Sequence, residues 1–485
     1  MSITSALSNA LSGLNATTRA AEVVSSNVAN AMTEGYGRRE IELGARQIGN
    51  TASGVSVVGI QRATDPVITG ERRLSDGLVG LESTRVDYYD TISRALGQAD
   101  EAGSITGLVI DLETSLIEAS NHPESDTHLY AVSNSASALS DRINSAADAI
   151  SQARQNADQD IATTVDRLQS ALDKIAKINV DIQKNVSSGY DASGLMDQRQ
   201  LLIDEVSQII PVKEVEREHG MVSLYTPGGS ILLASKAATI EFSPVNTITP
   251  DMVVDPGVLS GLKINGQSVS TSAENGPIAG GELAGLFEIR DTLAPEAQTK
   301  LDAFARDLVE RFQDPAMDPT ISAGMAGLFT DGGAAFDIAN EEGLSNRLEL
   351  NQAVNPNEGG DLWRLRDGIG AASEGDAGNA TLLQSMLSKL QSGVATTSGG
   401  FSTIERTSRG LSSDLFSYFE TAGLASQSDL SYASAQQMSL KTIELENGVD
   451  TDNELQKLLL IERSYAANAK VIETVETLFD ELMRI

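Results

Sequence analysis

Residues 136–175 read ASALSDRINSAADAISQARQNADQDIATTVDRLQSALDKI, and the spacing of their apolar side chains decides the fold class. Apolar residues recur every three or four positions, which is typical of one buried face of a helix. Consecutive steps of four, at Ile161 and Val165, form a stutter, which locally unwinds a supercoil without ending the helix. We therefore expect one helix of about 45–55 residues, longer than the average globular helix and suited to an elongated bundle.

Both ends of the chain carry a similar pattern. The N-terminal seam follows a 4-3 spacing through Ile3, Leu7, Ala10, Leu14, Thr17, Ala21, Val24, Val28 and Ala31. The C-terminal seam repeats it through Leu458, Ile461, Tyr465, Asn468, Ile472, Val475, Phe479 and Leu482. Such narrow seams bury little area, so we expect the two helices to pair with each other. The alternative is two separate amphipathic helices on a globular core. Thr451 and Glu454 form a capping-box pattern at the start of the second helix.

Further helices are expected at 191–208, 281–313, 379–392 and 402–446. Between residues 211 and 280, short runs such as Met221–Tyr225 alternate with turn signals, including Asn265-Gly266, which is a hairpin signal. We predict a mainly α, elongated, multi-domain rod with an inserted small β domain. Its expected parts are a terminal coiled-coil domain (1–45 and 446–485), a helical bundle (46–210, 281–313 and 376–445) and an outer β-rich domain (211–280 and 314–375).

Composition excludes several classes of protein. The chain has 35 basic and 68 acidic side chains, a net charge of −33, and no cysteine. No disulfide or thiolate site can form, and general nucleic-acid binding is not expected from so acidic a chain. We expect no membrane span and no Sec-type signal peptide. The acidity is uneven: residues 1–64 hold five Arg and four Glu, whereas residues 314–380 hold twelve acids and three Arg. The termini are therefore expected to contact protein and the acidic segment to face water.

Catalytic and cofactor-binding patterns are absent from the sequence. His122, His128 and His219 show no metal-binding spacing, and no phosphate-binding loop, nucleophile elbow or dinucleotide-binding motif is present. Acidic pairs such as Glu341-Glu342 are expected to be solvated surface. The sequence predicts a protein that is not an enzyme and has no cofactor, no metal and no catalytic residue.

A motif follows the first helix. The segment 26–38, SNVANAMTEGYGR, resembles the signature of flagellar axial proteins, in which an Asn-rich helix end runs into Asn-Thr-Pro-Gly-Tyr and then Arg. Thr33, Gly35, Tyr36 and Arg38 match, whereas Met32, Glu34 and Gly37 depart from it. Gly35 is expected to end the helix and Tyr36 to anchor the exit of the chain. The missing proline makes the turn less rigid.

Three other stretches narrow the resemblance to the flagellar hook-associated protein 1 family. They are 195–205 (LMDQRQLLIDE), 280–291 (GGELAGLFEIRD) and 447–472, which contains NGVD and SYAANAKVI. Each is weak alone, but together they follow the family's order along nearly the whole chain. The resemblance implies a structural protein of the bacterial flagellum that joins hook to filament by axial packing of its terminal helices.

The same resemblance implies partners and location. We expect self-association in a ring or helical tube, contact with the hook protein and a second junction protein, and an export chaperone at the C-terminal helix. The chain would leave the cell by type III export, with no nucleic-acid or membrane partner. The expected axial-packing and partner-binding residues are Ile3, Leu7, Leu14, Val24, Asn27, Val28, Asn30, Gly35, Tyr36, Leu458, Ile461, Tyr465, Asn468, Ile472, Val475, Phe479 and Leu482. Asn468 either fixes the register of the pair or is merely tolerated.

Two alternatives remain at this stage. One is another flagellar axial protein of the hook or rod type, although the helical character of residues 131–208 favours the junction protein. The other is a surface-exposed adhesin or binding module that uses the β insertion as its binding surface.

Overall fold

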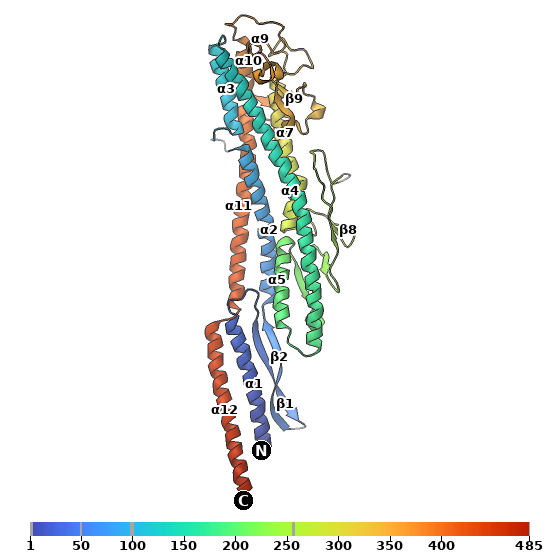
Figure 1. Cartoon of the computed structure of the whole chain (residues 1–485), viewed down its shortest axis with the longest axis vertical. Coiled ribbons are helices and arrows are strands. Elements are labelled where there is room, and N and C mark those ends of the chain that lie inside the picture. Colours follow the sequence, from blue (N-terminus) through green and yellow to red (C-terminus); the bar gives the residue numbers. More distant parts are fainter. Residues whose placement is uncertain (1–2, 49–50, 98–100, 255–257, 485) are drawn as a thin grey trace.

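Helices run along one long axis through most of the chain (Figure 1). The computed structural model describes residues 3–48, 51–97, 101–254 and 258–484. The mainly α, elongated fold predicted from the sequence is confirmed. The helices are α1 (Ile3–Ala29), α2 (Pro66–Leu96), α3 (Ile105–Asn121), α4 (Asp126–Ser187), α5 (Ser193–Ile209), α6 (Glu282–Glu288), α7 (Ala294–Phe312), α8 (Leu344–Arg347), α9 (Arg364–Asp367), α10 (Thr381–Gln391), α11 (Ser408–Glu446) and α12 (Thr451–Arg484).

Strands form small antiparallel sheets beside the helices. The longest pair is the hairpin of β1 (Arg38–Ile48) and β2 (Thr51–Ala63) near the chain termini. The others are β3 (Lys213–Glu216), β4 (Val222–Tyr225), β5 (Ile231–Leu233), β6 (Ile240–Glu241), β7 (Lys263–Ile264), β8 (Gln267–Ser268), β9 (Phe329–Asp331), β10 (Leu348–Leu350), β11 (Val394–Ala395) and β12 (Glu405–Arg406). The predicted Asn265-Gly266 hairpin is confirmed, since both residues have the positive φ that a type I′ turn requires.

Helix α4 connects two hydrophobic cores. Its N-terminal half shares one core with α2, α3, α7, α10 and α11, and its C-terminal half shares a second core with α5, α6 and strands β4 to β7. The change from one core to the other falls between Ala157 and Ile161. The predicted stutter lies there, so the altered spacing turns the buried face of the helix from one set of partners to the other.

A buried polar layer separates the two cores. Arg290 is fully buried in a π-helical segment, Ile289–Leu293, which joins α6 to α7. Its Nη1 donates to Asp158 Oδ1 at 2.8 Å, and its guanidinium lies 4.9 Å from the ring centroid of Phe287. Buried charge is tolerated here because two carboxylates, Asp158 and Asp291, and an aromatic face contact it.

Some elements differ from the sequence-based expectation. Helix α4 begins ten residues before the first predicted position, Ala136, and has 62 residues. The β1–β2 hairpin lies where no strand was predicted, because Ile41, Leu43, Val55 and Val57 alternate with polar residues only briefly. The inserted strands also supply core side chains such as Leu224 and Leu233, both fully buried. The limits of the predicted domains stay a prediction.

Candidate functional site: the terminal helix pair and its junction

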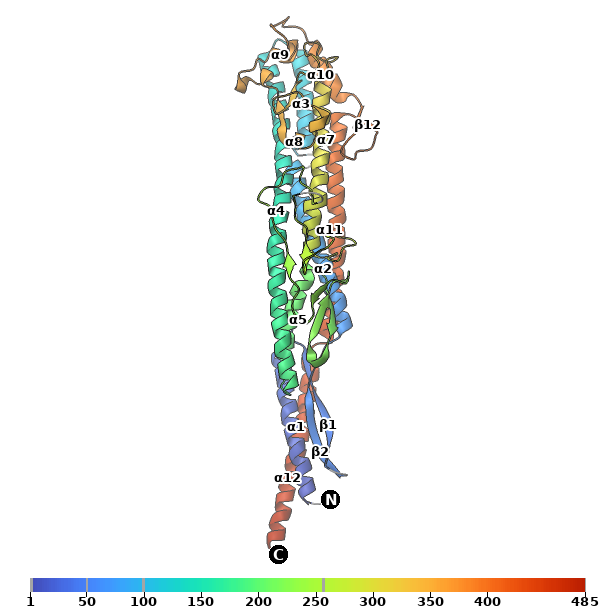
Figure 2. The ribbon, with the colours of Figure 1, turned by 90° about the vertical axis from the view of Figure 1, so that its right-hand side faces the viewer.

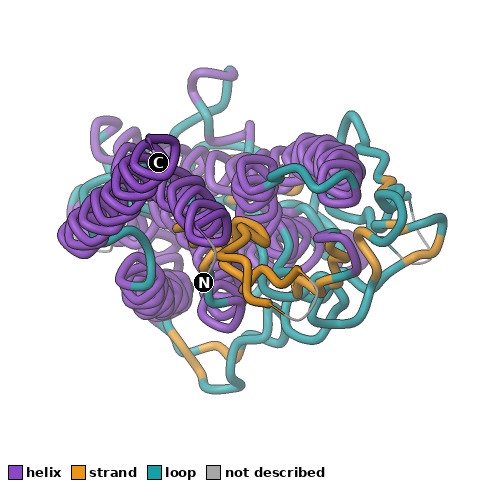
Figure 3. The backbone as a smooth tube through the Cα atoms, turned by 90° about the horizontal axis from the view of Figure 1, so that it is seen from below, coloured by secondary structure: helices purple, strands orange, loops and turns teal. Residues whose placement is uncertain are grey.

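Helices α1 and α12 lie side by side at one end of the rod (Figures 1 and 2). The predicted pairing of the two terminal helices is confirmed. The β1–β2 hairpin packs against α1, so that α1 lies between α12 and the strands when the rod is seen from below (Figure 3). Neither hydrophobic core contains a described residue of α1 or α12. The terminal pair is therefore a separate layer built on the end of the bundle.

The predicted seam residues lie at different depths in this pair. Val24, Asn27 and Val475 are buried, and Ile3, Leu7, Leu14, Val28, Asn30, Gly35, Tyr36, Ile461, Asn468 and Ile472 are half-buried. Leu458, Tyr465, Phe479 and Leu482 are exposed. At about 1.5 Å per residue, α12 is roughly 10 Å longer than α1, so its last turns extend past the N-terminus of α1 (Figure 1).

Asn468 fits against a glycine of the opposite helix. A Cβ added at Gly13 would lie 2.8 Å from both amide atoms of Asn468. The amide itself donates from Nδ2 to Ser464 O in its own helix, at 3.0 Å, and makes no hydrogen bond across the pair. The missing side chain at Gly13 therefore makes room for the polar residue, and the fit is steric.

Asn27 is the centre of the junction between the helix pair and the rest of the chain. Its Oδ1 accepts from Tyr36 Oη and from Arg39 N, each at 2.9 Å. Its Nδ2 donates to Arg39 O and to Glu454 Oε2, also at 2.9 Å. These four bonds use the whole hydrogen-bonding capacity of an amide side chain. One fully buried residue thus ties α1 to the turn after it, to β1 and to the start of α12.

The side chain of Glu454 binds Asn27 in this junction and does not form the predicted capping box. Its side chain is buried and is held by Asn27 and by Lys457 Nζ, which lies 2.7 Å from Oε1. Asp450 caps α12 instead, because its Oδ1 accepts from the backbone N–H of Asp452 and of Asn453. The capping-box prediction was therefore wrong.

Asp197 of α5 fastens the chain that leaves α1 to the helical bundle. Its carboxylate accepts from Gly37 N at 3.0 Å, from Arg62 Nε at 2.7 Å and from Arg39 Nη2 at 3.3 Å. Two residues later, Arg199 donates from Nη1 to Asn179 Oδ1 and Gly220 O, and burial lowers its pKa to about 10. Through Asp197 and Arg199, the 195–199 motif thus joins α5 to the segment that follows α1, to α4 at Asn179 and to the loop at Gly220.

At the same end of the bundle, ion pairs connect α2 to α5 and to the end of α11. Arg72 of α2 contacts Asp76, Asp204 and Glu444, and Glu444 also accepts from Thr69 Oγ1 at 2.9 Å. Burial acts to lower the pKa of Arg72, but the neighbouring carboxylates of Asp204 and Glu444 raise it above its usual value. The end of α11, which leads into α12, is therefore fixed to α2.

Gly35 occupies a left-handed position, and the side chain of Leu201 lies close to where its Cβ would be. Its φ is +75°, and an added Cβ would lie 2.7 Å from Leu201 of α5. We expect Gly35→Ala to destabilise the junction by about 2 kcal/mol through backbone strain and steric overlap. Gly189→Ala is the matched control, because Gly189 has a φ of +74° with no heavy atom within 4 Å of its Cβ position. Denaturant unfolding of both variants compares the losses, and equal losses would contradict a role for the Leu201 contact.

The described residues show neither a metal-ion cluster nor a membrane-spanning helix. They contain no group of three or more His, Cys, Asp or Glu side chains arranged to hold a metal ion. Among the same residues, no helix combines the length and the hydropathy of a membrane span.

Sequence reasoning did not single out several residues of the junction. Arg39, Arg62 and Asp197 meet only in the folded chain, and no local pattern links them. The one available signal was the position of Asp197 inside the 195–199 motif. Gly13, which makes room for Asn468, is one of 42 glycines and carries no distinguishing neighbour in the sequence.

Three protein families match parts of the chain, in order along it. Residues 7–36 match a family described as flagella basal body rod protein, and residues 446–485 match the flagellar basal body rod FlgEFG protein C-terminal family. Between them, residues 89–316 match the helical domain of flagellar hook-associated protein FlgK.

Known relatives align along the whole chain. Flagellar hook-associated protein 1 of Bacillus subtilis is 22% identical over 98% of this chain and 97% of its own length. The Escherichia coli protein of the same name is 23% identical over the full length of both. Among solved structures, the flagellar hook junction protein FlgK from Burkholderia pseudomallei is 22% identical, with a TM-score of 0.42. That match covers 55% of this chain and 47% of the other.

Proposed function

Because the chain belongs to the flagellar hook-associated protein 1 family, we propose that it is a structural subunit of the junction between hook and filament. The observation that carries this proposal is the apolar surface that α12 leaves exposed. A helix with many exposed large apolar side chains is typical of a surface that binds other proteins. On α12 they are Leu455, Leu458, Leu459, Leu460, Tyr465, Val471, Leu478, Phe479, Leu482 and Met483.

The terminal pair is the part that packs along the axis of the assembly. Helix α12 contacts α1 up to its last turns and has only isolated contacts with other described elements. Its remaining surface is therefore available to neighbouring subunits. In this proposal, residues 1–45 and 446–485 line the inner tube, the helical bundle packs around them and the β-rich segments face outward. Buried seam residues hold the pair together, while the exposed ones, such as Leu458 and Tyr465, contact neighbours.

Partners and location follow from this role. The subunits associate in a ring or helical tube, with the hook protein on one side and a second junction protein on the other. An export chaperone covers the apolar surface of α12 before assembly, and the chain acts outside the cell as part of the flagellum. The protein has no enzymatic activity. Matches at both ends to flagellar rod families support an axial position.

The two alternatives have less support. A hook or rod protein does not account for the match of residues 89–316 to the helical domain of a hook-associated protein. An adhesin that used residues 211–280 as a free binding module does not account for the buried side chains of β4 and β5, which belong to the second core.

Deletion of the gene tests the proposal. We expect cells that assemble hooks without filaments and release flagellin monomers into the medium. Electron microscopy of the cell surface and analysis of the culture medium measure both effects, and a plasmid copy of the gene should restore filaments. Normal filaments on the deletion strain would contradict the proposal, whereas loss of the hooks themselves would favour the hook or rod alternative.

A further inference from the structure

Helix α11 carries an uncharged, exposed stripe, here called the α11 stripe. Its members follow a 4-3 spacing and are Leu424, Ser428, Ser431, Ala435, Met438, Thr442 and Leu445. The three large apolar side chains among them, Leu424, Met438 and Leu445, are 62%, 66% and 67% exposed. Residues 421–440 contain one charged side chain, Asp429, although 21% of the whole chain is charged. Such a face is typical of a helix that packs against another helix.

The α11 stripe lies opposite the contact of α11 with α2. Ala433 of α11 is buried, and its carbonyl accepts from Ser75 Oγ of α2 at 3.2 Å. A helix turns by about 100° per residue, so Leu424 and Ala435 lie roughly 160–180° around α11 from Ala433. Helix α11 runs along an outer side of the bundle, with α2 beside it (Figure 1). The stripe therefore faces away from the helices of its own subunit.

A groove of about 620 Å³ lies on the far side of α2, here called the α2–α4 groove. Residues 84–91 of α2 and 149–167 of α4 line it, together with part of α6. A Cβ added at Gly423 of α11 would lie 3.3 Å from Tyr89 Cβ of α2. At about 100° per residue, the groove residues Asp87 and Thr91 lie roughly 160° around α2 from Tyr89. The groove and α11 are therefore on opposite sides of α2.

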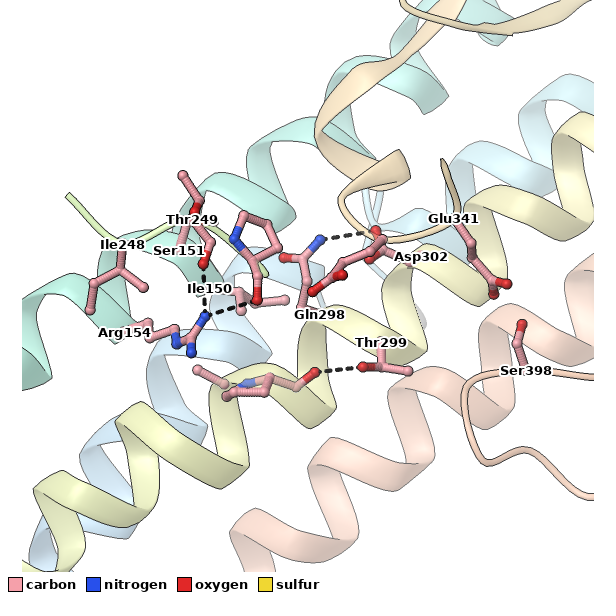
Figure 4. A pocket seen from close by; sticks show the side chains of 14 residues that line it. Ile150, Ser151, Arg154, Ile248, Thr249, Gln298, Thr299, Asp302, Glu341 and Ser398 are labelled. Carbon is pink, nitrogen blue, oxygen red and sulfur yellow. Dashed lines mark hydrogen bonds between the residues drawn. The ribbon is translucent and has the colours of Figure 1, made fainter. Parts of the chain in front are cut away.

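Small side chains line the α4 wall of this groove. Ala149, Ala153 and Ala157 follow one another at intervals of four residues on α4. Short side chains at such positions let a second helix approach closely. A neighbouring side of α4 is covered, because Arg154 Nη1 donates to Thr249 O at 3.1 Å and the loop at Thr249 lies across it (Figure 4). The alanines therefore belong to the side of α4 that is open to a partner.

The stripe and the groove match in level and in length. Helix α2 contacts α11 near Tyr89, and residues 84–91 of α2 line the groove, so the two surfaces lie at overlapping levels of the rod. At about 1.5 Å per residue, the stripe is roughly 32 Å long and the α4 wall roughly 27 Å. Two surfaces that face opposite ways at one level can meet between neighbouring copies placed side by side.

Charge also favours the stripe as the occupant of the groove. The charged residues of the groove lining are Asp87, Asp160, Glu282 and Arg167, three acids against one Arg. The Arg167 guanidinium is paired with Glu282. A groove with this charge repels acidic surfaces, and the chain has a net charge of −33. An uncharged helix face avoids that repulsion, and the α11 stripe is such a face.

We propose that the α11 stripe of one copy of the chain docks into the α2–α4 groove of the next copy. The contact is heterologous, because it joins two different surfaces, and its repetition around an axis closes a ring if the rotation between copies closes. This inference rests on the proposed function and adds to it a lateral contact between the helical bundles.

Cross-linking of two single-cysteine chains tests this contact, because the chain has no cysteine of its own. Full-length Ala435→Cys places the thiol in the stripe, and full-length Ala153→Cys, which carries a tag of different mass, places it in the groove. A short bis-maleimide added to the purified mixture should link one chain of each kind. Gln436→Cys is the matched control for Ala435→Cys, since this exposed neighbour is turned about 100° away from it. The control should give far less mixed product.

A charge placed in the stripe should prevent the contact. Met438→Glu in the Ala435→Cys chain should lower the yield of mixed product roughly tenfold, because docking would remove a carboxylate from water. Met32→Glu, at a residue that is 99% exposed and outside the stripe, should leave the yield unchanged. Circular dichroism checks that both variants keep their helix content.

Three results would overturn the inference. They are the absence of mixed product, an equal yield with Gln436→Cys, and a product that links two Ala435→Cys chains, which would place the stripes of two copies face to face. Purified chains are used, so the result does not depend on hooks or filaments. If the deletion strain lacks filaments but the mixed product does not form, the lateral contact is wrong and the proposed function stands.

Discussion

Replacement of Asn27 by Leu is expected to release the terminal helices from the bundle. The change keeps the size of the side chain but removes all four hydrogen bonds of the buried amide. Tyr36 Oη, the Arg39 backbone and the buried Glu454 carboxylate each lose a partner. With about 1–3 kcal/mol for each buried group left unpaired, we expect a loss of about 3 kcal/mol after partial relaxation.

Hydrogen exchange measures this loss locally, because a multi-domain rod does not unfold in one step. Amides of α1 and α12 should exchange roughly 100-fold faster in Asn27→Leu, while those of α4 stay unchanged. Asn15→Leu is the matched control: the same substitution in the same helix at an exposed position without a hydrogen-bond partner. Equal protection in the two variants would show that Asn27 does not hold the junction.

Periodicity predicted the helical layers well. The stripe from Ala136 to Ile175 indicated the long helix α4, and the buried positions Leu139, Ile143, Leu168 and Leu172 follow it. The two terminal seams indicated a pair because neither was wide enough to bury against a core. These inferences succeed because helix packing is a repeated local pattern that the sequence displays directly.

Contacts between distant residues were not predictable in the same way. Asn27 and Glu454 are 427 positions apart, and Asp197 meets Arg62 across 135 positions. Glu454 matched a local capping rule, but the tertiary contact with Asn27 determines where its side chain lies. The β1–β2 hairpin was missed for a related reason: it packs on α1, and only that contact distinguishes its short alternating runs from loop.

The seam spacing predicted which faces of α1 and α12 lie against each other better than it predicted how far each seam residue is buried. Phe479 and Leu482 continue the spacing but are exposed, because α12 extends beyond α1. Asn468 fits the seam through the space at Gly13, a relation between two helices that neither helix shows alone. Sequence spacing gives the face of a helix, whereas the length of its partner decides how much of that face is covered.

Removal of residues 446–485 is expected to have the largest effect of any change considered. It takes away α12, uncovers the side chains of α1 that α12 contacts and leaves Asn27 without Glu454. Both hydrophobic cores lie outside the removed segment, so the bundle should keep its helical circular dichroism and unfold within a few degrees of the full-length chain. A variant that keeps the pair, Leu459→Ser with Leu460→Ser, removes two exposed side chains only and should weaken assembly without loosening α1.

The claim that residues 446–485 are needed for the junction is tested most directly in a deletion strain that produces only the truncated chain. The measurement is the number of filament-bearing hooks, counted by electron microscopy. An immunoblot of the culture medium establishes that the truncated chain is exported. We expect hooks without filaments and free flagellin, with filaments restored by the full-length chain. Filaments attached to hooks in cells that make only the truncated chain would contradict the claim.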